Sequence, residues 1–171
     1  VRVGLELCED LWAPLPPSTY LALAGAEVLL NLSASNETIG KGAYRKSLVS
    51  QQSARCLCAY AYASAGAGES TTDVVYSGAC LIYENGACLG QTPPGVGREG
   101  RVLADVDLGR LRADRLKSTT YRDCAALYPR EPGARVVRAP MALRSDGSLY
   151  PLRKLPFVPA DQAGRLARCR E

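Results

Sequence analysis

Cys8 is the strongest candidate for a nucleophile in this sequence. The residues before it, Val1–Leu7, alternate apolar and polar side chains, which predicts a strand with one buried face. A side chain directly after such a strand lies at the carboxyl edge of the sheet, where α/β enzymes present reactive groups. A thiol there becomes a nucleophile when a cation or a helix N-terminus lowers its pKa. The other role open to Cys8 on position alone is that of a small buried hydrophobe.

The residue types that are missing narrow the chemistry further. The chain has no histidine, which excludes Ser-His-Asp and Cys-His catalysis and His-ligated metals within it. Acid–base chemistry must therefore use Glu, Asp, Lys, Tyr or Cys. The seven cysteines include no Cys-x-x-Cys pair, so neither a disulfide framework nor a zinc site is predicted.

The composition is that of one globular domain, with 171 residues, 47% hydrophobic and 22% charged. No apolar run reaches the roughly 18 residues of a membrane span, and no secretory signal opens the chain. We therefore expect a cytoplasmic protein with free thiols and no membrane partner. Residues 91–171 contain 16 basic and 9 acidic groups, but these are interspersed without an aromatic-basic motif, so no nucleic-acid partner is expected.

The elements that would position Cys8 follow an α/β order. Strands are predicted at 1–7, 27–32, 59–64, 79–83, 87–91 and 102–106, and helices at 18–26, 43–58, 108–117 and from 163 onward. Asn85-Gly86 predicts a hairpin turn, and Asp107 is placed to cap a helix. Residues 119–159 are rich in Pro, Gly and Arg without periodicity, which indicates a surface excursion or a linker.

Some conspicuous side chains have structural interpretations at this stage. Tyr60 and Tyr62 are interpreted as core packing. Glu69, in a glycine-rich loop, either lines an active site or hydrogen-bonds to a neighbouring threonine, Thr71 or Thr72. The arginines of the predicted helix 108–117 are interpreted as a solvated face: Arg110, Arg112 and Arg115.

Several long motifs resemble one known family. Leu5–Trp12 and Pro14–Ser18 resemble the nucleophile segment in the nitrilase-like glutaminase domain of the glutamine-dependent NAD⁺ synthetase family. The resemblance continues in register through Ala24–Ala26, Asn31–Lys41, Gln52–Cys56 and Gly68–Asp73. Pro156–Asp161 is similar to the connector that leads to the synthetase domain of that family. The resemblance covers nearly the whole chain and is weakest over 93–150.

The resemblance implies an α/β fold of the carbon-nitrogen hydrolase type, a nitrilase-like four-layer α-β-β-α sandwich of which only the C-terminal portion is present. Residues 1–118 would be the C-terminal part of the glutaminase domain. Residues 119–171 would be an extended excursion and a linker toward a synthetase domain that this chain lacks. No phosphate loop of the Ser-Gly-Gly-x-Asp kind occurs in the sequence.

The resemblance also implies a reaction and the residues for it. Cys8 would attack the side-chain amide of L-glutamine, release ammonia and form a glutamyl thioester that water hydrolyses. The backbone N–H of Glu9 would bind the oxyanion, and Ser35 and Lys41 would contact glutamine. The parent enzyme would be a ligase that uses ATP and Mg²⁺ in the absent domain to amidate deamido-NAD⁺, with no cofactor or metal in this chain. A homo-oligomer is expected.

One part of the family's site has no counterpart here. Nitrilase-like sites combine Cys with a general-base Glu and a Lys that both precede it, whereas only seven residues precede Cys8. Glu6 is a poor substitute, because alternation along a strand turns it to another face. The chain is therefore expected to be inactive alone, and its uncovered apolar strands should make it insoluble, molten or oligomeric. The alternatives are another nitrilase-superfamily amidase and a non-catalytic interaction module with an inert Cys8.

Overall fold

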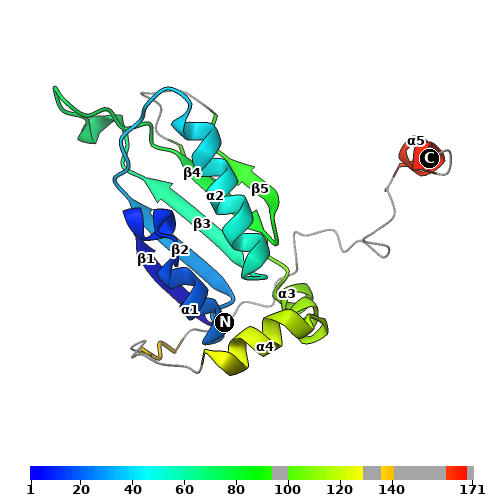
Figure 1. The fold of residues 1–171 in the computed structure, drawn as a ribbon. Helices are drawn as coiled ribbons and strands as arrows, with labels where there is room; N and C mark the ends of the chain where they lie inside the picture. Colours follow the sequence, from blue (N-terminus) through cyan, green and yellow to red (C-terminus); the bar gives the residue numbers. More distant parts are fainter. Residues whose placement is uncertain (94–99, 129–135, 141–160, 169–171) are drawn as a thin grey trace. The chain divides into compact units, whose positions relative to one another are not determined.

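The computed structural model describes residues 1–93, 100–128, 136–140 and 161–168. Its centre is a five-stranded sheet with the strand order β1-β2-β3-β4-β5 (Figure 1). The strands are β1 (Val3–Leu7), β2 (Val28–Ser33), β3 (Ala59–Ser64), β4 (Cys80–Glu84) and β5 (Ala87–Gln91). The first three are parallel, and the last two join them in antiparallel pairing. The α/β fold class predicted from the sequence is thereby confirmed.

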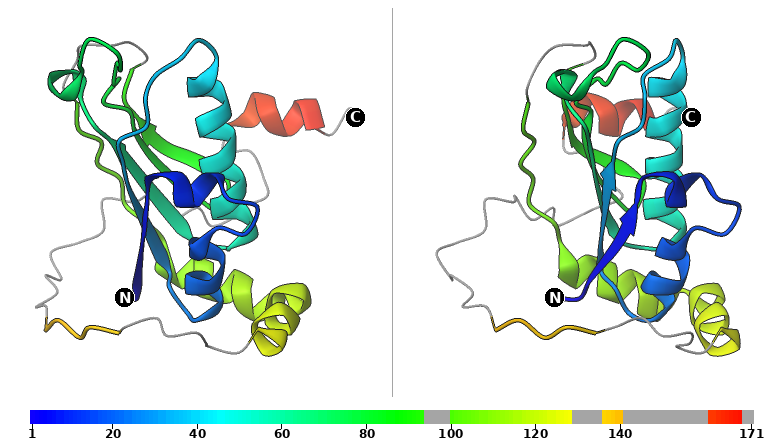
Figure 2. Two further views of the ribbon diagram at one scale, coloured as in Figure 1. Left: turned by 60° about the vertical axis from the view of Figure 1, so that its left-hand side comes forward. Right: turned by 90° about the vertical axis from the view of Figure 1, so that its left-hand side faces the viewer.

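The helices are mostly those that the sequence predicts. They are η1 (Cys8–Trp12), α1 (Pro17–Leu23), α2 (Lys41–Arg55), η2 (Ala67–Glu69), α3 (Leu108–Lys117), α4 (Thr119–Leu127) and α5 (Gln162–Arg168). Both α1 and α2 lie on the same face of the sheet (Figure 2). Helix α5 belongs to a separate unit, 140–171, whereas the other elements belong to 1–139. Among the described residues, no helix is both long and apolar enough to cross a bilayer.

Two β-α-β units place the ends of the parallel strands together. Strand β1 leads through η1 and α1 to β2, and β2 leads through α2 to β3. In register, Leu7 lies beside Leu32, and Ser33 lies beside Ser64. The carboxyl ends of all three strands therefore share one edge of the sheet, and Cys8 is the first residue beyond that edge on β1.

The alternation in β1 is present, but the covered face is the opposite of the one expected. Gly4 and Glu6 are buried under α1, whereas Val3, Leu5 and Leu7 are 53–65% exposed. Gly4 allows this close approach, since a Cβ there would lie 2.9 Å from a Leu29 methyl carbon. Alternation identifies the two faces of a strand but does not say which face a helix covers. The apolar face of β1 is thus the open one.

The predicted hairpin and the predicted cap are both confirmed. Asn85 and Gly86 have φ of 44° and 84°, the left-handed pair that a tight turn between β4 and β5 requires. At the start of α3, the Asp107 Oδ1 accepts a hydrogen bond of 2.9 Å from the Arg110 amide. These short-range signals act within four residues, so the sequence alone was sufficient to predict them.

Two predictions of secondary structure are wrong. Residues 102–106 form no strand, although the Val102 side chain packs against Gly90 of β5. Thr119–Leu127 is the helix α4, with Ser118 as its N-cap, and not part of an irregular excursion. The remainder of the predicted linker lies largely outside the described residues, including 156–160 of the proposed connector, so the domain assignment 1–118 and 119–171 stays a prediction.

The side-chain interpretations hold for the tyrosines and fail for Arg115. Tyr60 and Tyr62 are almost fully buried in the core. Arg115 is not solvated, because its Nε donates to the Leu57 carbonyl at 2.9 Å and its Nη2 to those of Ala26 and Cys56. Arg112 forms an ion pair with the buried Glu27. These arginines attach α3 to the amino-terminal edge of the sheet.

Candidate active site

Cys8 stands where β1 ends and η1 begins, with its side chain partly exposed. Its φ is 45°, in the left-handed region that non-glycine residues rarely occupy. The turn is held on both sides, because the Asn31 Nδ2 donates to the Cys8 carbonyl at 3.3 Å and the Leu7 amide donates to Asp10 Oδ2 at 2.8 Å. Residues with such strained backbone angles are concentrated at functional sites. There the surrounding structure holds a side chain in an orientation that its own backbone preference would not give.

Asn31 links this turn to the interior of the sheet. It is 1% exposed in the middle of β2, and its Oδ1 accepts a hydrogen bond of 3.0 Å from the Ser33 hydroxyl. Its amide therefore has a fixed orientation toward Cys8. An apolar residue at this position would leave the Cys8 carbonyl without that donor.

Glu6 lies on the covered face and has structural partners. The Ser18 amide donates to its Oε2 at 2.8 Å, and the Tyr60 hydroxyl donates to its Oε1. Burial, together with the charge of the Glu6 carboxylate, raises the pKa of Tyr60, so this hydroxyl keeps its proton. Both carboxylate oxygens are thus engaged between β1, α1 and β3. This arrangement agrees with the expectation that Glu6 does not replace the general base.

The other predicted site residues surround the same edge of the sheet. Glu9 is in the first turn of η1, where backbone amides have no intrahelical acceptor, and its side chain is exposed. Ser35 is buried in the loop after β2. Lys41 opens α2, and its Nζ donates to Asn36 Oδ1 at 2.6 Å and lies 5.3 Å from the ring centre of Trp12 in η1. Among the described residues, no hydrogen bond joins Cys8 to Ser35 or Lys41.

Of the two roles predicted for Glu69, the hydrogen bond to a threonine is not present in the described residues, and a place in the wall of an active site stays a prediction. Its side chain is exposed at the end of η2, and no hydrogen bond joins it to a threonine. The Thr71 hydroxyl instead accepts from the backbone amides of Asp73 and Val74. The hydroxyls of Thr71 and Ser70, and not the Glu69 carboxylate, therefore bond to the backbone amides of this loop.

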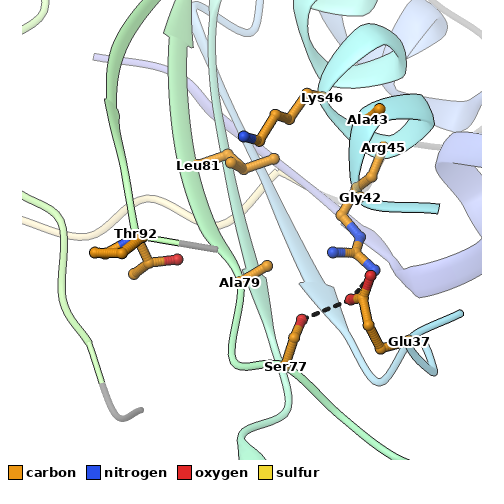
Figure 3. Close-up of a pocket in the computed structure, with 10 residues that line it drawn as sticks. Glu37, Gly42, Ala43, Arg45, Lys46, Ser77, Ala79, Leu81 and Thr92 are labelled. Atoms are coloured by element: carbon orange, nitrogen blue, oxygen red, sulfur yellow. Dashed lines mark hydrogen bonds and ion pairs between the residues drawn. The ribbon is translucent and has the colours of Figure 1, made fainter. Parts of the chain in front are cut away.

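A buried ion pair beside this edge was missed at the sequence level. Arg45 on the inner face of α2 donates to Glu37 Oε2 at 2.8 Å, and the Ser77 hydroxyl donates to the same oxygen at 2.7 Å (Figure 3). Burial opposes ionisation of Glu37, but the hydrogen bonds from Ser77 and Arg45 outweigh it and lower the pKa of Glu37. Arg45 lies on the same inward face of the helix as Val49 and Gln52. A charged residue at that position in the sequence could have indicated a buried ion pair.

These residues line a cavity of about 290 Å³ that also includes Lys46, Leu81 and Thr92 (Figure 3). Cys8, Ser35 and Lys41 are not among its lining residues. The cavity lies beside α2 over β4, so it is separate from the Cys8 turn. Within the described residues, no group of three or more Cys, Asp or Glu side chains is arranged to hold a metal ion.

Comparison with known proteins assigns the fold to a family. Residues 1–116 match the carbon-nitrogen hydrolase family, which is more than half of the chain. The chain belongs to the carbon-nitrogen hydrolase family. A solved carbon-nitrogen hydrolase from Helicobacter pylori G27 has a similar fold, with a TM-score of 0.59 and 19% identity over 71% of this chain and 45% of that one.

Within this family, the chain is similar to glutamine-dependent NAD⁺ synthetases. It is 44% identical over 164 residues to the protein of that name from Mycobacterium tuberculosis, and 42% identical over 160 residues to the one from Mycobacterium leprae. Each match covers 92% of this carbon-nitrogen hydrolase chain and 24% of the relative. The chain thus spans about a quarter of the length of the mycobacterial relatives that it matches.

Proposed function

We propose that this carbon-nitrogen hydrolase chain is part of the glutaminase of a glutamine-dependent NAD⁺ synthetase. The observation that carries the proposal is the Cys8 turn: a cysteine with positive φ at the carboxyl edge of a parallel sheet, braced by Asn31. The mycobacterial relatives, 42–44% identical over nearly the whole chain, support the choice of glutamine as the substrate.

The proposed reaction forms and breaks one thioester. The Cys8 sulfur attacks the side-chain amide carbon of glutamine, and the carbonyl oxygen becomes an oxyanion near the Glu9 amide. The carbon–nitrogen bond then breaks. The leaving nitrogen takes up the proton that the Cys8 thiol gave up, and it departs as ammonia. Water attacks the thioester, glutamate departs, and the Cys8 sulfur regains its proton. A Glu and a Lys that assist these proton transfers, as the family resemblance implies, would come from outside this chain.

Ser35 and Lys41 are proposed to bind the free amino acid. An ammonium at Lys41 is suited to the α-carboxylate of glutamine, because it is a compact charge with three donors on a flexible stem. Trp12 and Asn36 hold this ammonium beside η1, the helix that starts with Cys8. The released ammonia would then serve ATP-dependent amidation of deamido-NAD⁺ elsewhere in the parent protein.

An affinity-labelling experiment tests the assignment of Cys8. A chloromethyl ketone analogue of glutamine should alkylate Cys8 in the native parent protein, and added L-glutamine should slow that reaction. Peptide mapping by mass spectrometry should find the label on Cys8 and not on Cys88, an exposed cysteine in β5 that serves as the control. Equal labelling of the two cysteines, unaffected by glutamine, would favour an inert Cys8 and a non-catalytic module. Protection by a simple amide instead of glutamine would favour another amidase.

A further inference from the structure

A second cavity, of about 470 Å³, lies between α1, the end of α2 and α4. Its volume is in the range of small-molecule sites, roughly 300–1,000 Å³. Three tyrosines are among the residues that line it: Tyr20, Tyr121 and Tyr128. None of the residues proposed for glutamine hydrolysis lines it. The cavity is therefore distinct from the proposed glutaminase site.

Two cysteines, Cys56 and Cys124, line this cavity. Cys56 is only 3% exposed overall, and the Gln52 Nε2 donates a hydrogen bond to its sulfur at 3.4 Å. Gln52 is buried, and its Nε2 also lies 2.9 and 3.0 Å from the hydroxyls of Ser18 and Thr19, so its two N–H groups are shared among three acceptors. Cys56 is thus a wall residue of the cavity, and a reagent would have to enter the cavity to meet its sulfur.

The surroundings of Cys56 favour its thiolate. A hydrogen bond from the Cys58 thiol outweighs burial and, together with the charge of Arg115, lowers the pKa of Cys56. Arg115 is held in place by the carbonyls of Ala26 and Cys56 and by the Tyr121 ring, 5.0 Å from its guanidinium. Cys58 is fully buried and hydrogen-bonds to Cys56, and both effects raise its pKa. Of this pair, Cys56 is the nucleophile and Cys58 remains a neutral thiol.

We propose that this cavity is a modification site where Cys56 undergoes thiol–disulfide exchange with a small aromatic disulfide. The aromatic group would pack among Tyr20, Tyr121 and Tyr128. The Cys56 thiolate attacks one sulfur of the reagent, a new S–S bond forms, and the original S–S bond breaks. The departing thiolate takes up the proton that Cys56 released. Cys56 is oxidised, and one half of the reagent is reduced to a thiol. This exchange does not involve Cys8.

The test uses 2,2′-dithiodipyridine on the native protein with Cys8→Ala, so that the proposed nucleophile gives no signal. Peptide mass mapping over time should show Cys56 modified at least about tenfold faster than Cys58. Thr120→Trp, at a residue that lines the cavity, should slow the reaction of Cys56 and leave that of Cys88 in β5 unchanged. Thr72→Trp, at an exposed position in the loop after η2, is the matched control and should change neither rate.

A second measurement, with a larger disulfide, tests the proposal without changing any residue of the cavity. Glutathione disulfide is larger, so it should modify the exposed Cys88 but not Cys56. The proposal is overturned if Cys56 reacts no faster than Cys58, if its rate matches global unfolding in a denaturant series, or if glutathione disulfide modifies it as fast as Cys88. Because Cys8 is absent from this experiment, either outcome is independent of the glutaminase assignment.

Discussion

The residues around Cys8 divide into a turn that presents the thiol and a buried layer that fixes the turn. Glu6 belongs to the buried layer, with its carboxylate bonded to the Ser18 amide and the Tyr60 hydroxyl. Alternation along β1 does not separate Glu6 from Cys8, because positions two apart share a face of a strand. The expectation that Glu6 is not the general base stays a prediction, supported by its buried partners. The bracing role of Asn31 could not be predicted, because it depends on contact between residues 23 positions apart.

Glu6→Gln should therefore reduce stability and leave the chemistry unaffected. We expect the free energy of unfolding to fall by about 1–3 kcal/mol, since the buried amide and hydroxyl lose a charged acceptor. Glutamine hydrolysis per folded molecule of the parent protein should stay within about twofold. Glu9→Gln is the matched control, because the exposed Glu9 side chain should change stability by less than about 0.5 kcal/mol. A folded Glu6→Gln protein with a hundredfold loss of kcat would refute this reading.

Lys41→Met tests the proposed carboxylate partner. Loss of a charge-assisted hydrogen bond to the substrate should raise KM for glutamine about tenfold or more, whereas kcat should change little, because that contact is the same in the ground and transition states. Lys46→Met, one turn further along α2 and lining the Figure 3 cavity, should leave KM unchanged. A fall in kcat with constant KM in Lys41→Met would contradict the binding role.

The elements show which signals in the sequence were local and which were not. The Asn85-Gly86 turn and the Asp107 cap depend on neighbours within four residues, and both were predicted. The strand at 102–106 was wrong because a period-two pattern does not specify a hydrogen-bonding partner. Helix α4 was not predicted because its nine residues lie within a longer stretch that is rich in Pro and Gly, although Ser118 offered a capping signal.

The ion pair between Glu27 and Arg112, which joins α3 to the sheet, predicts a dependence of stability on pH. The hydrogen bond from Arg112 lowers the pKa of Glu27 below its ordinary value. The stabilisation is therefore fully present above the unfolded-state pKa of about 4.3 and is lost as the pH falls through the lower folded-state pKa. Arg112 is largely exposed, so solvent screens the ion pair and the effect on stability should be small.

In urea titrations, wild type should be more stable than Glu27→Gln at pH 7, and the difference should shrink between about pH 5 and pH 3. Glu37 has a lowered pKa in both proteins, so its own acid dependence cancels in the comparison. If the stability difference between the two proteins stays constant or grows in acid, this ion pair does not cause the pH dependence of stability.

At the scale of the whole molecule, the sheet has one face under α1 and α2 and an opposite face with exposed apolar side chains. Val3, Leu5, Leu7 and Leu32 are each more than half exposed. Leu5 pairs in register with Leu30, and Leu7 with Leu32, so these side chains form one contiguous surface on β1 and β2. An apolar sheet face of this kind drives association.

The chain alone should therefore self-associate. Sedimentation velocity should show an average mass that rises with concentration, and the double variant Leu5→Lys, Leu32→Lys should shift the distribution toward 18.2 kDa. The exposed Leu127→Lys on α4, which is outside this face, should have no such effect. A wild-type chain that remains monomeric and melts cooperatively would refute the expectation.

The most direct test of the central claim is a comparison of nitrogen sources in the parent protein with Cys8→Ala. If Cys8 is the glutaminase nucleophile, the variant should lose at least about 10³-fold of its glutamine-dependent amidation of deamido-NAD⁺, yet retain nearly wild-type amidation with free ammonia. If the variant keeps full activity with glutamine, or loses activity equally with both nitrogen sources, Cys8 does not supply the ammonia and the proposed function is wrong.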